Sequence, residues 1–290
     1  MHARPPKHLE ERFDWYASAI VEDPASLKGN WAATRMPGAQ RVHLDLGCGK
    51  GEWTCASAKA SPNDLWIGFD YEKICIAMSA KKAVVEDQIP NVVFAMTNGN
   101  TLAETIDDAE IDVLHLNFST PCPRKKQAPQ RLTHAQRLME YRRILAPGGR
   151  IELKTDSQPF FDWTLHQLDY AGYQVQWSTR DLYALAATGN DTPIDPTIVS
   201  GYEQRLVAKG AKVHALIAVP GPVPDELPQQ TCPQGLMDYL PHDAEELMAL
   251  DYIPYGMEEY VENVVNRARN EARKAKAAQR AAANKKRSNQ

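Results

Sequence analysis

A glycine-rich turn, Gly47-Cys48-Gly49-Lys50-Gly51, directly follows the apolar run from Val42 to Leu46 and constrains this chain more than any other segment. A second apolar run closes on Asp70, nineteen residues after the last glycine of the turn. A strand, a tight turn, a helix and a second strand that ends in a carboxylate predict one βαβ unit. In such a unit the glycines let the backbone approach an adenosine-like ligand, and the carboxylate accepts hydrogen bonds from the ribose hydroxyls.

Apolar runs of strand length recur along the chain, separated by turn residues and by helical patterns. We expect strands at residues 41–46, 65–70, 91–96, 111–117, 149–154, 173–177 and 212–219. A helix that begins near Thr133 is expected to end at Leu145, because Pro147 and Gly148 follow it. The alternation of strands and helices predicts an α/β fold with a doubly wound, mostly parallel seven-stranded sheet.

The composition excludes several classes of protein. No run approaches the ~18 apolar residues of a membrane span, and the first residues lack the apolar stretch of a secretion signal. The five cysteines are odd in number and none form a Cys-x-x-Cys pair, which favours reduced thiols in a cytoplasm and argues against a disulfide frame or a zinc knuckle. We therefore expect a cytoplasmic protein with no metal site.

Charge divides the chain unevenly. Residues 267–290 hold nine Lys or Arg and one Glu, a balance of +8, which leaves −12 on the rest of a chain whose total is −4. We expect an N-terminal segment at 1–40, a main domain at 41–219 that contains the sheet, and a Pro-rich linker with a charged tail at 220–290, helical from Met257 to Ala283 or in part disordered. The basic tail suits either contact with nucleic-acid phosphates or plain solvation, and the sequence leaves both open.

Polar residues stand at the end of each of the first five expected strands. The glycine turn follows the first, Asp70 ends the second, Asn98 follows the third, Asn117 ends the fourth, and Asp156 follows the fifth. Because ligands of doubly wound sheets collect at the carboxyl ends of the strands, these residues predict a single pocket there.

The turn also narrows the choice of ligand. Nicotinamide dinucleotides need a seat for pyrophosphate, usually Gly-x-Gly-x-x-Gly, whereas this chain has Gly-x-Gly-x-Gly followed at once by Glu52. A carboxylate at that place, with Asp45 nearby on the first strand, suits a ligand that has a positive centre and no phosphate. S-adenosylmethionine fits this description.

Several motifs, in order between Leu27 and Val219, resemble those of the bacterial tRNA (guanine-N7-)-methyltransferase family. The segments are Leu27-Lys28-Gly29-Asn30-Trp31, Leu44 to Gly51, Ile67-Gly68-Phe69-Asp70, Pro90-Asn91-Val92, Leu116-Asn117-Phe118-Ser119, Arg131-Leu132-Thr133, Leu153-Lys154-Thr155-Asp156 and Gly201-Tyr202-Glu203 with Gly210 behind it. The resemblance implies a class I (Rossmann-like) methyltransferase fold, S-adenosylmethionine as donor, and a guanine in the variable loop of tRNA as acceptor. It implies action on tRNA as a monomer or homodimer.

Position within these motifs assigns roles to individual residues. The residues expected to bind the cofactor are Asp45, Gly47, Gly49, Gly51, Asp70, Asn98 and Asn117. The expected catalytic residues are Thr120, Arg124 and Asp156, and the residues expected to bind the substrate are Arg124, Lys125, Asp156, Ser200, Tyr202 and Glu203.

The chain departs from the family pattern at several positions, most of them in the acceptor half. Thr120 stands where the family has an aspartate, Cys122 where it has a tryptophan, Asn98 where an aspartate is usual, and Ser200 where a threonine is usual. An Arg-His pair of the family is replaced around Gln127. The residues expected to bind the cofactor therefore match the family pattern more closely than the residues expected to bind the acceptor.

The implied reaction makes modest chemical demands. Guanine N7 is a plain acceptor without a hydrogen, so attack on a sulfonium methyl group needs alignment and no proton removal. Asp156 and Glu203 are candidates to accept the N1–H and N2–H groups of guanine, and ion pairing with Lys154 or Arg205 is the equally open alternative. Two other functions also stay open: a methyltransferase with a small-molecule acceptor, and a non-catalytic RNA-binding paralogue.

Overall fold

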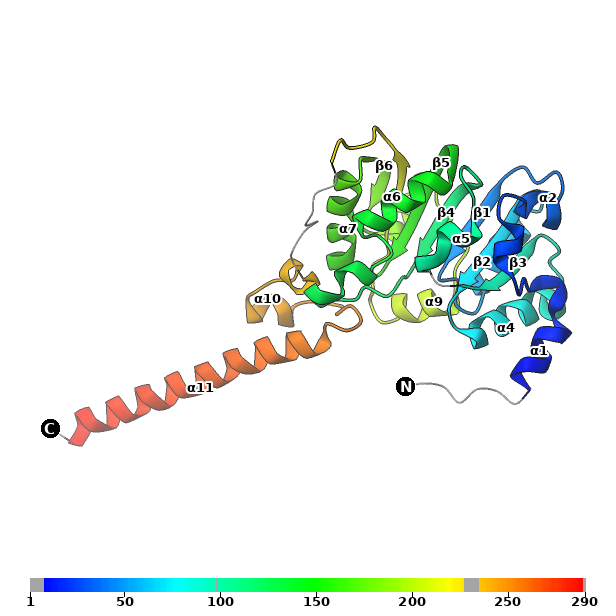
Figure 1. Cartoon of the computed structure of the whole chain (residues 1–290). Coiled ribbons are helices and arrows are strands. Elements are labelled where there is room, and N and C mark those ends of the chain that lie inside the picture. Colours follow the sequence, from blue (N-terminus) through cyan, green and yellow to red (C-terminus); the bar gives the residue numbers. More distant parts are fainter. Residues whose placement is uncertain (1–7, 98, 227–234, 289–290) are drawn as a thin grey trace.

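The computed structural model describes residues 8–97, 99–226 and 235–288. Within them, seven strands form one sheet (Figure 1). The strands are β1 (Val42–Leu46), β2 (Leu65–Asp70), β3 (Val92–Met96), β4 (Ile111–Asn117), β5 (Leu145–Thr155), β6 (Tyr173–Thr179) and β7 (His214–Pro220).

Helices connect and flank these strands. They are α1 (Leu9–Trp15), α2 (Trp31–Arg35), α3 (Glu52–Ala60), α4 (Lys73–Lys81), α5 (Leu102–Thr105), α6 (Ala135–Ile144), α7 (Gln158–Tyr170), α8 (Leu182–Ala187), α9 (Gly201–Val207), α10 (Ala244–Met248) and α11 (Glu258–Ser288). None of the helices in the described part of the chain is both long enough and apolar enough to cross a membrane.

The strand order is β3-β2-β1-β4-β5-β7-β6, and β7 runs antiparallel to both of its neighbours while the other pairs are parallel. The predicted mostly parallel, seven-stranded sheet is thus confirmed. The order reverses between β1 and β4, which creates the crevice in which doubly wound proteins bind their ligands.

The fifth strand begins earlier than expected. Leu145 already pairs with Ile111, and the register then jumps so that Arg150 pairs with Val113. The predicted turn after α6 is therefore an irregular bulge inside β5, made possible by Gly148, whose φ of 81° suits glycine.

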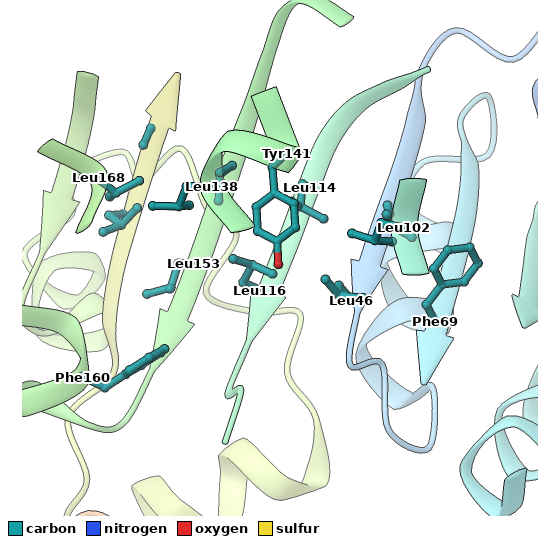
Figure 2. Close-up of a cluster of buried hydrophobic side chains, with 14 of the residues drawn as sticks. Leu46, Phe69, Leu102, Leu114, Leu116, Leu138, Tyr141, Leu153, Phe160 and Leu168 are labelled. Carbon is teal, nitrogen blue, oxygen red and sulfur yellow. The ribbon is translucent and has the colours of Figure 1, made fainter. Parts of the chain in front are cut away.

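Alternate residues of each strand face opposite sides of the sheet, and both sides are covered. Figure 2 shows one side, where Leu138 and Tyr141 of α6 lie over Leu114 and Leu116 of β4 and Leu153 of β5. On the other side Trp66 and Phe94, from β2 and β3, pack against Cys55 of α3 and Ile76 of α4. Helices on both faces explain why β1 and β2 are buried along their whole length.

The residues after β7 are anchored to the same core. Leu236, Leu247, Met257, Val261 and Val265 are all buried in the cluster that covers the sheet. Past Val265, every residue of α11 up to Arg280 is exposed except Ala268, which is half-buried. Figure 1 shows the helix extending away from the sheet. The expected helix in this region is confirmed, whereas the division of the chain at 40 and 219 stays a prediction.

Candidate active site at the carboxyl edge of the sheet

A cavity of about 620 Å³ lies where the parallel strands end. Figure 1 shows α9 and the beginning of α11 on this side of the sheet. The lining comes from β1, the glycine turn, the loop after β4, α9 and the segment before α11: Asp45, Gly47, Cys48, Gly49, Lys50, Glu52, Trp53, Cys75, Asn117, Phe118, Ser119, Thr120, Pro121, Asp156, Ser200, Tyr202, Glu203, Arg205 and Tyr255. The structure thus brings most of the predicted site residues together.

The glycine turn forms one wall of this cavity. Its first residue is fixed by the backbone, because the Gly47 N–H donates to the Phe69 carbonyl oxygen at 2.8 Å. Gly47 and Gly49 have φ values of 88° and 56°, and a Cβ on either would meet no atom within 4 Å. The backbone is therefore open to a ligand here, as expected. Gly51 has another role, because a Cβ there would lie 2.7 Å from the Ser79 side chain of α4.

Asp70 lies behind the glycine turn. Its Oδ2 accepts from the Gly49 N–H and its Oδ1 from the Glu72 N–H, both at 2.9 Å. The side chain is buried, which raises its pKa, and it is not among the residues that line the cavity. Asp70 therefore supports the turn, and its direct contact with a ligand stays a prediction.

Asp45 points a buried carboxylate at the cavity. Its Oδ2 accepts from the Thr54 hydroxyl at 2.5 Å, and its Oδ1 has no hydrogen-bond partner among the described residues. Burial raises the pKa of Asp45 to about 6. A buried carboxylate oxygen left without a donor suits a ligand with an ammonium group.

The end of β4 supplies further unpaired polar groups. The Asn117 side-chain amide nitrogen and the Ser119 hydroxyl are buried without a partner among the described residues, and both residues line the cavity. Phe118, between them, has a φ of 50°, which is unusual for a residue with a side chain. Asn98, the predicted contact after β3, lies outside the described residues.

On the acceptor side, Asp156, Thr120 and Tyr202 lie around the same cavity. The Tyr252 hydroxyl donates to Asp156 Oδ2 at 2.5 Å, and burial raises the pKa of Asp156. Ser200 caps α9, because its hydroxyl accepts from the Glu203 N–H at 3.1 Å. Its predicted substrate role therefore comes with a structural one.

Glu203 is buried and fully engaged. Its Oε2 lies 2.8 Å from the Lys154 ammonium group, and its Oε1 accepts from the Tyr183 hydroxyl at 2.8 Å. The ion pair with Lys154, one of the two readings left open by the sequence, is the arrangement found. A direct contact between Glu203 and a substrate stays a prediction.

Comparison with known proteins shows the family to which this chain belongs. The model of a putative methyltransferase family matches residues 39–216. A tRNA (guanine-N(7)-)-methyltransferase of Limosilactobacillus reuteri (strain DSM 20016) is 33% identical over 199 residues, 69% of this chain and 90% of that protein. An enzyme of the same name from Lactococcus lactis subsp. cremoris (strain SK11) is 32% identical over 219 residues, 75% and 97% of the two chains. The chain belongs to the tRNA (guanine-N7-)-methyltransferase family. The resemblance inferred from the motifs is confirmed.

Solved structures agree on the fold of this methyltransferase. The 16S rRNA methyltransferase KamB superposes with a TM-score of 0.51 at 16% identity, covering 67% of this chain and 94% of that one. A mutant 16S rRNA (adenine(1408)-N(1))-methyltransferase from Catenulisporales acidiphilia, solved with its cosubstrate S-adenosylmethionine, has a TM-score of 0.50 at 21% identity, covering 71% and 94%. At these identities the likeness shows the class I methyltransferase fold alone.

The cofactor side of this methyltransferase fits S-adenosylmethionine. The unpaired Asp45 oxygen suits the ammonium group of the ligand, and the two unpaired donors of Asn117 and Ser119 suit carboxylate or adenine acceptors. Backbone at Gly47 and Gly49 leaves open space beside them. The cavity thus offers one unpaired acceptor and two unpaired donors. They match a ligand that carries a positively charged ammonium group and a negatively charged carboxylate.

Arg124 and Lys125 lie outside this cavity, exposed on the loop after β4. Their loop is held from below by Arg131, whose buried guanidinium donates to the carbonyl oxygens of Pro121 and Cys122 and lies 4.3 Å over the Trp163 ring. Both basic side chains are exposed, so phosphates can reach them. Their catalytic and binding roles stay predictions.

Sequence reasoning missed two tyrosines and one carboxylate contact of this methyltransferase. Tyr252 and Tyr255 reach the site from beyond the family match, and Glu52 accepts from the Gly201 N–H at 2.6 Å. The sequence held only a weak signal for the tyrosines, two aromatic rings around Pro254 in a stretch without Lys or Arg.

Proposed function

We propose that this chain transfers the methyl group of S-adenosylmethionine to N7 of a guanine in the variable loop of tRNA. One observation carries the proposal beyond family membership: a single cavity joins Asp45, Gly49 and Asn117 on the cofactor side to Thr120 and Asp156 on the acceptor side. Donor and acceptor can therefore meet in one cavity. The two relatives above, both named tRNA (guanine-N(7)-)-methyltransferase, support the choice of acceptor.

S-adenosylmethionine supplies, when bound, an electrophilic methyl group on a positively charged sulfur. The chain has to hold the base with N7 aligned, because N7 already offers a lone pair and gives up no proton. Asp45 would hold the ammonium end of the cofactor, and the Asp156 carboxylate would accept hydrogen bonds from the N1–H and N2–H groups of guanine. Thr120 places a hydroxyl at the exposed edge of the cavity, where it can orient the base as donor or acceptor.

The RNA backbone would be held at the rim. Arg124, Lys125 and Lys126 are exposed on the loop that Arg131 fixes, a few residues after Pro121, which lines the cavity. Such side chains contact phosphates without reading sequence, so they set the register of the RNA, while the cavity selects the base.

Three transcripts of one tRNA test the proposal. One carries guanine at the variable-loop position, one carries adenine there, and one carries 7-deazaguanine, which keeps the Watson–Crick edge and lacks N7. We expect transfer from methyl-labelled S-adenosylmethionine to the first alone, with N7-methylguanosine found by nucleoside mass spectrometry. Equal labelling of all three would refute the assignment of the atom.

The same assay separates the two alternatives. Labelling of small acceptors with none of tRNA would point to a small-molecule methyltransferase. Calorimetry that detects no binding of S-adenosylmethionine would point to a non-catalytic RNA-binding paralogue.

We further propose that the enzyme acts in the cytoplasm as a monomer or homodimer. The four cysteines in the described part of the chain, Cys48, Cys55, Cys75 and Cys122, are free, which supports a reducing compartment. Light scattering on the purified full-length chain would give the oligomeric state.

A further inference from the structure

The segment at residues 250–255, between α10 and α11, lies against the acceptor end of the cavity. Its Tyr252 hydroxyl donates to Asp156 Oδ2 at 2.5 Å, and its Tyr255 lines the cavity itself. The segment follows the family match, which ends at residue 216. It is thus a part of this chain for which the family model gives no role.

Packing on both sides fixes the place of this segment. Before it, Leu247 of α10 is 1% exposed, and after it Met257 is fully buried in the main core. Gly256 lies close to the loop after β4, which we call the acceptor loop. A Cβ on Gly256 would come within 3.2 Å of the Pro123 ring. The Leu236 N–H also donates to the Pro123 carbonyl oxygen at 2.9 Å. The segment is therefore held as a wall beside the loop after β4.

Two partly exposed tyrosines from different elements line the cavity. Tyr202 of α9 is 42% exposed and Tyr255 is 64% exposed, and both line the cavity. The same two tyrosines, with Tyr252, also line an adjoining cavity of about 470 Å³ between α9 and the segment. Large aromatic side chains left open to solvent at a cavity mouth suit stacking on unpaired bases, which is how proteins commonly hold single-stranded RNA.

Tyr252 acts on the acceptor side differently, through Asp156. Its hydroxyl donates a hydrogen bond to Oδ2 of the carboxylate. This bond fixes the side-chain rotamer of Asp156 and therefore also the position of Oδ1. Asp156 lies directly after β5 and is only partly exposed. A hydrogen bond that holds its carboxylate in one orientation would therefore help it to bind a substrate in a defined geometry.

We propose that residues 250–255 form the acceptor-base wall of the active site, in which Tyr255 stacks with Tyr202 on the flipped base and Tyr252 is a positioning residue for Asp156. This inference rests on the proposed tRNA methylation and names the residues that hold its acceptor. An RNA base is thereby recognised by a segment that lies outside the part of the chain shared with the family model.

Four single variants of the full-length chain test the wall: Tyr255→Ala, Tyr255→Phe, Tyr252→Phe and Tyr260→Phe. Tyr260 lies on α11 and outside the lining of both cavities, so it is the matched control for loss of a hydroxyl group. For each variant, kcat and KM are measured with tRNA, and the Kd of S-adenosylmethionine is measured by calorimetry.

We expect Tyr255→Ala to raise the KM for tRNA at least about fivefold, in line with the loss of one base–aromatic stack, and Tyr255→Phe to recover most of that loss. Tyr252→Phe is expected to lower kcat by roughly tenfold, since one charge-assisted hydrogen bond is lost. The Kd of S-adenosylmethionine stays within about twofold in every variant, because the cofactor half is untouched. Tyr260→Phe matches the wild type in all three quantities.

The outcomes separate the two proposals. If the wild-type chain methylates tRNA and the Tyr252 and Tyr255 variants match it, the wall is refuted while the tRNA function stands. A rise in the cofactor Kd equal to the loss with tRNA would also refute the wall, because it would show a general structural defect. A wild-type chain that methylates no tRNA guanine refutes the proposed function and this inference with it.

Discussion

The Glu52 carboxylate accepts a hydrogen bond from the backbone N–H of Gly201 at 2.6 Å, although 149 residues separate them. Glu52 is the first residue of α3, directly after the glycine turn, and Gly201 is the first residue of α9. The contact therefore ties the cofactor wall of the cavity to the acceptor wall. Gly201 also leaves room for it, since a Cβ there would lie 3.0 Å from the same carboxylate oxygen.

Removal of this contact is expected to loosen the cavity. Glu52→Ala should lower the free energy of unfolding by about 1.5–3 kcal/mol, the range for a hydrogen bond with one charged partner, and should raise the Kd of S-adenosylmethionine by roughly tenfold. Urea unfolding and calorimetry measure the two effects. Glu52→Gln keeps an acceptor oxygen and should lose less, while Glu104→Ala, an exposed position on α5, is the control. Equal effects from Glu52→Ala and Glu104→Ala would contradict the role of the contact.

Asp45 predicts how cofactor binding depends on pH. Burial raises the pKa of Asp45 to about 6, above the ordinary value of 3.8. Its contribution to folding stability is therefore fully present below the unfolded-state pKa and is lost as the pH rises to about 6. Binding of an ammonium group needs the ionised form, so the affinity should fall as the pH drops below about 6, by at most about tenfold per pH unit.

Calorimetric titration of S-adenosylmethionine from pH 5 to pH 8 measures this dependence. Asp45→Asn should weaken binding at neutral pH and should flatten the profile, because the titrating group is gone. A wild-type affinity that stays constant across this range would show that Asp45 does not face the charged end of the cofactor.

The buried pair of Lys154 and Glu203 gives a prediction about stability. Each side chain is 1% exposed, and their charged groups lie 2.8 Å apart. Glu203→Gln leaves the ammonium group without its counter-charge, which should cost about 3–5 kcal/mol of unfolding free energy. The double variant Glu203→Gln with Lys154→Met should be more stable than Glu203→Gln alone. Denaturant unfolding of the full cycle measures this, and additive losses would mean that the pair is not coupled.

Arg131 organises the acceptor loop through carbonyl groups that a lysine cannot reach in the same way. Its Nε and Nη2 atoms donate to the Pro121 and Cys122 carbonyl oxygens, and Cys122 holds a φ of 48°. Arg131→Lys should lower kcat/KM for tRNA by roughly 10- to 100-fold, since it removes a planar fork that fixes the loop. Binding of S-adenosylmethionine should change little. Arg41→Lys, at an exposed position before β1, serves as the control. If Arg131→Lys weakened cofactor binding to the same extent, Arg131 would support the whole fold and not the acceptor loop alone.

Local signals in the sequence are sufficient to predict the sheet and the cofactor wall. The glycine turn, the apolar runs and the polar strand ends each depend on a few adjacent residues, and the structure joins Asp45, Gly49, Asn117 and Asp156 as expected. Local sequence patterns do not predict the long-range contacts that join the walls of the cavity. The Tyr252 to Asp156 bond spans 96 residues, and the Glu52 to Gly201 bond depends on packing of α9 that no periodicity shows.

The same limit applies within β5 and at Glu203. The bulge after Leu145 depends on pairing with Ile111, a partner that the local turn pattern does not reveal. Whether Glu203 meets Lys154 or a substrate depends on burial of both, which the residue types alone leave undecided. Sequence patterns thus locate strand ends, while tertiary packing decides which charges are satisfied there.

The exposed part of α11 gives the last prediction. Arg269, Arg273, Lys276 and Arg280 recur at intervals of four, three and four residues, so they form one stripe along the helix. Past Val265 no side chain up to Arg280 is buried, so the stripe is open to solvent along its length. Residues 267–290 carry a balance of +8 on a chain that is negative elsewhere. We expect this stripe to contact tRNA phosphates away from the active site.

Salt dependence distinguishes such contacts from an inert tail. The double variant Arg273→Gln and Lys276→Gln should reduce the slope of log K against log salt for tRNA binding by about 0.7–0.9 per charge removed. Filter binding from 50 to 300 mM KCl measures the slopes. The control removes two exposed charges far from the cavity, Arg41→Gln with Lys59→Gln on α3, and should leave the slope unchanged. If both double variants share the wild-type slope, α11 makes no phosphate contacts, because release of counterions follows from each neutralised phosphate whatever the RNA sequence.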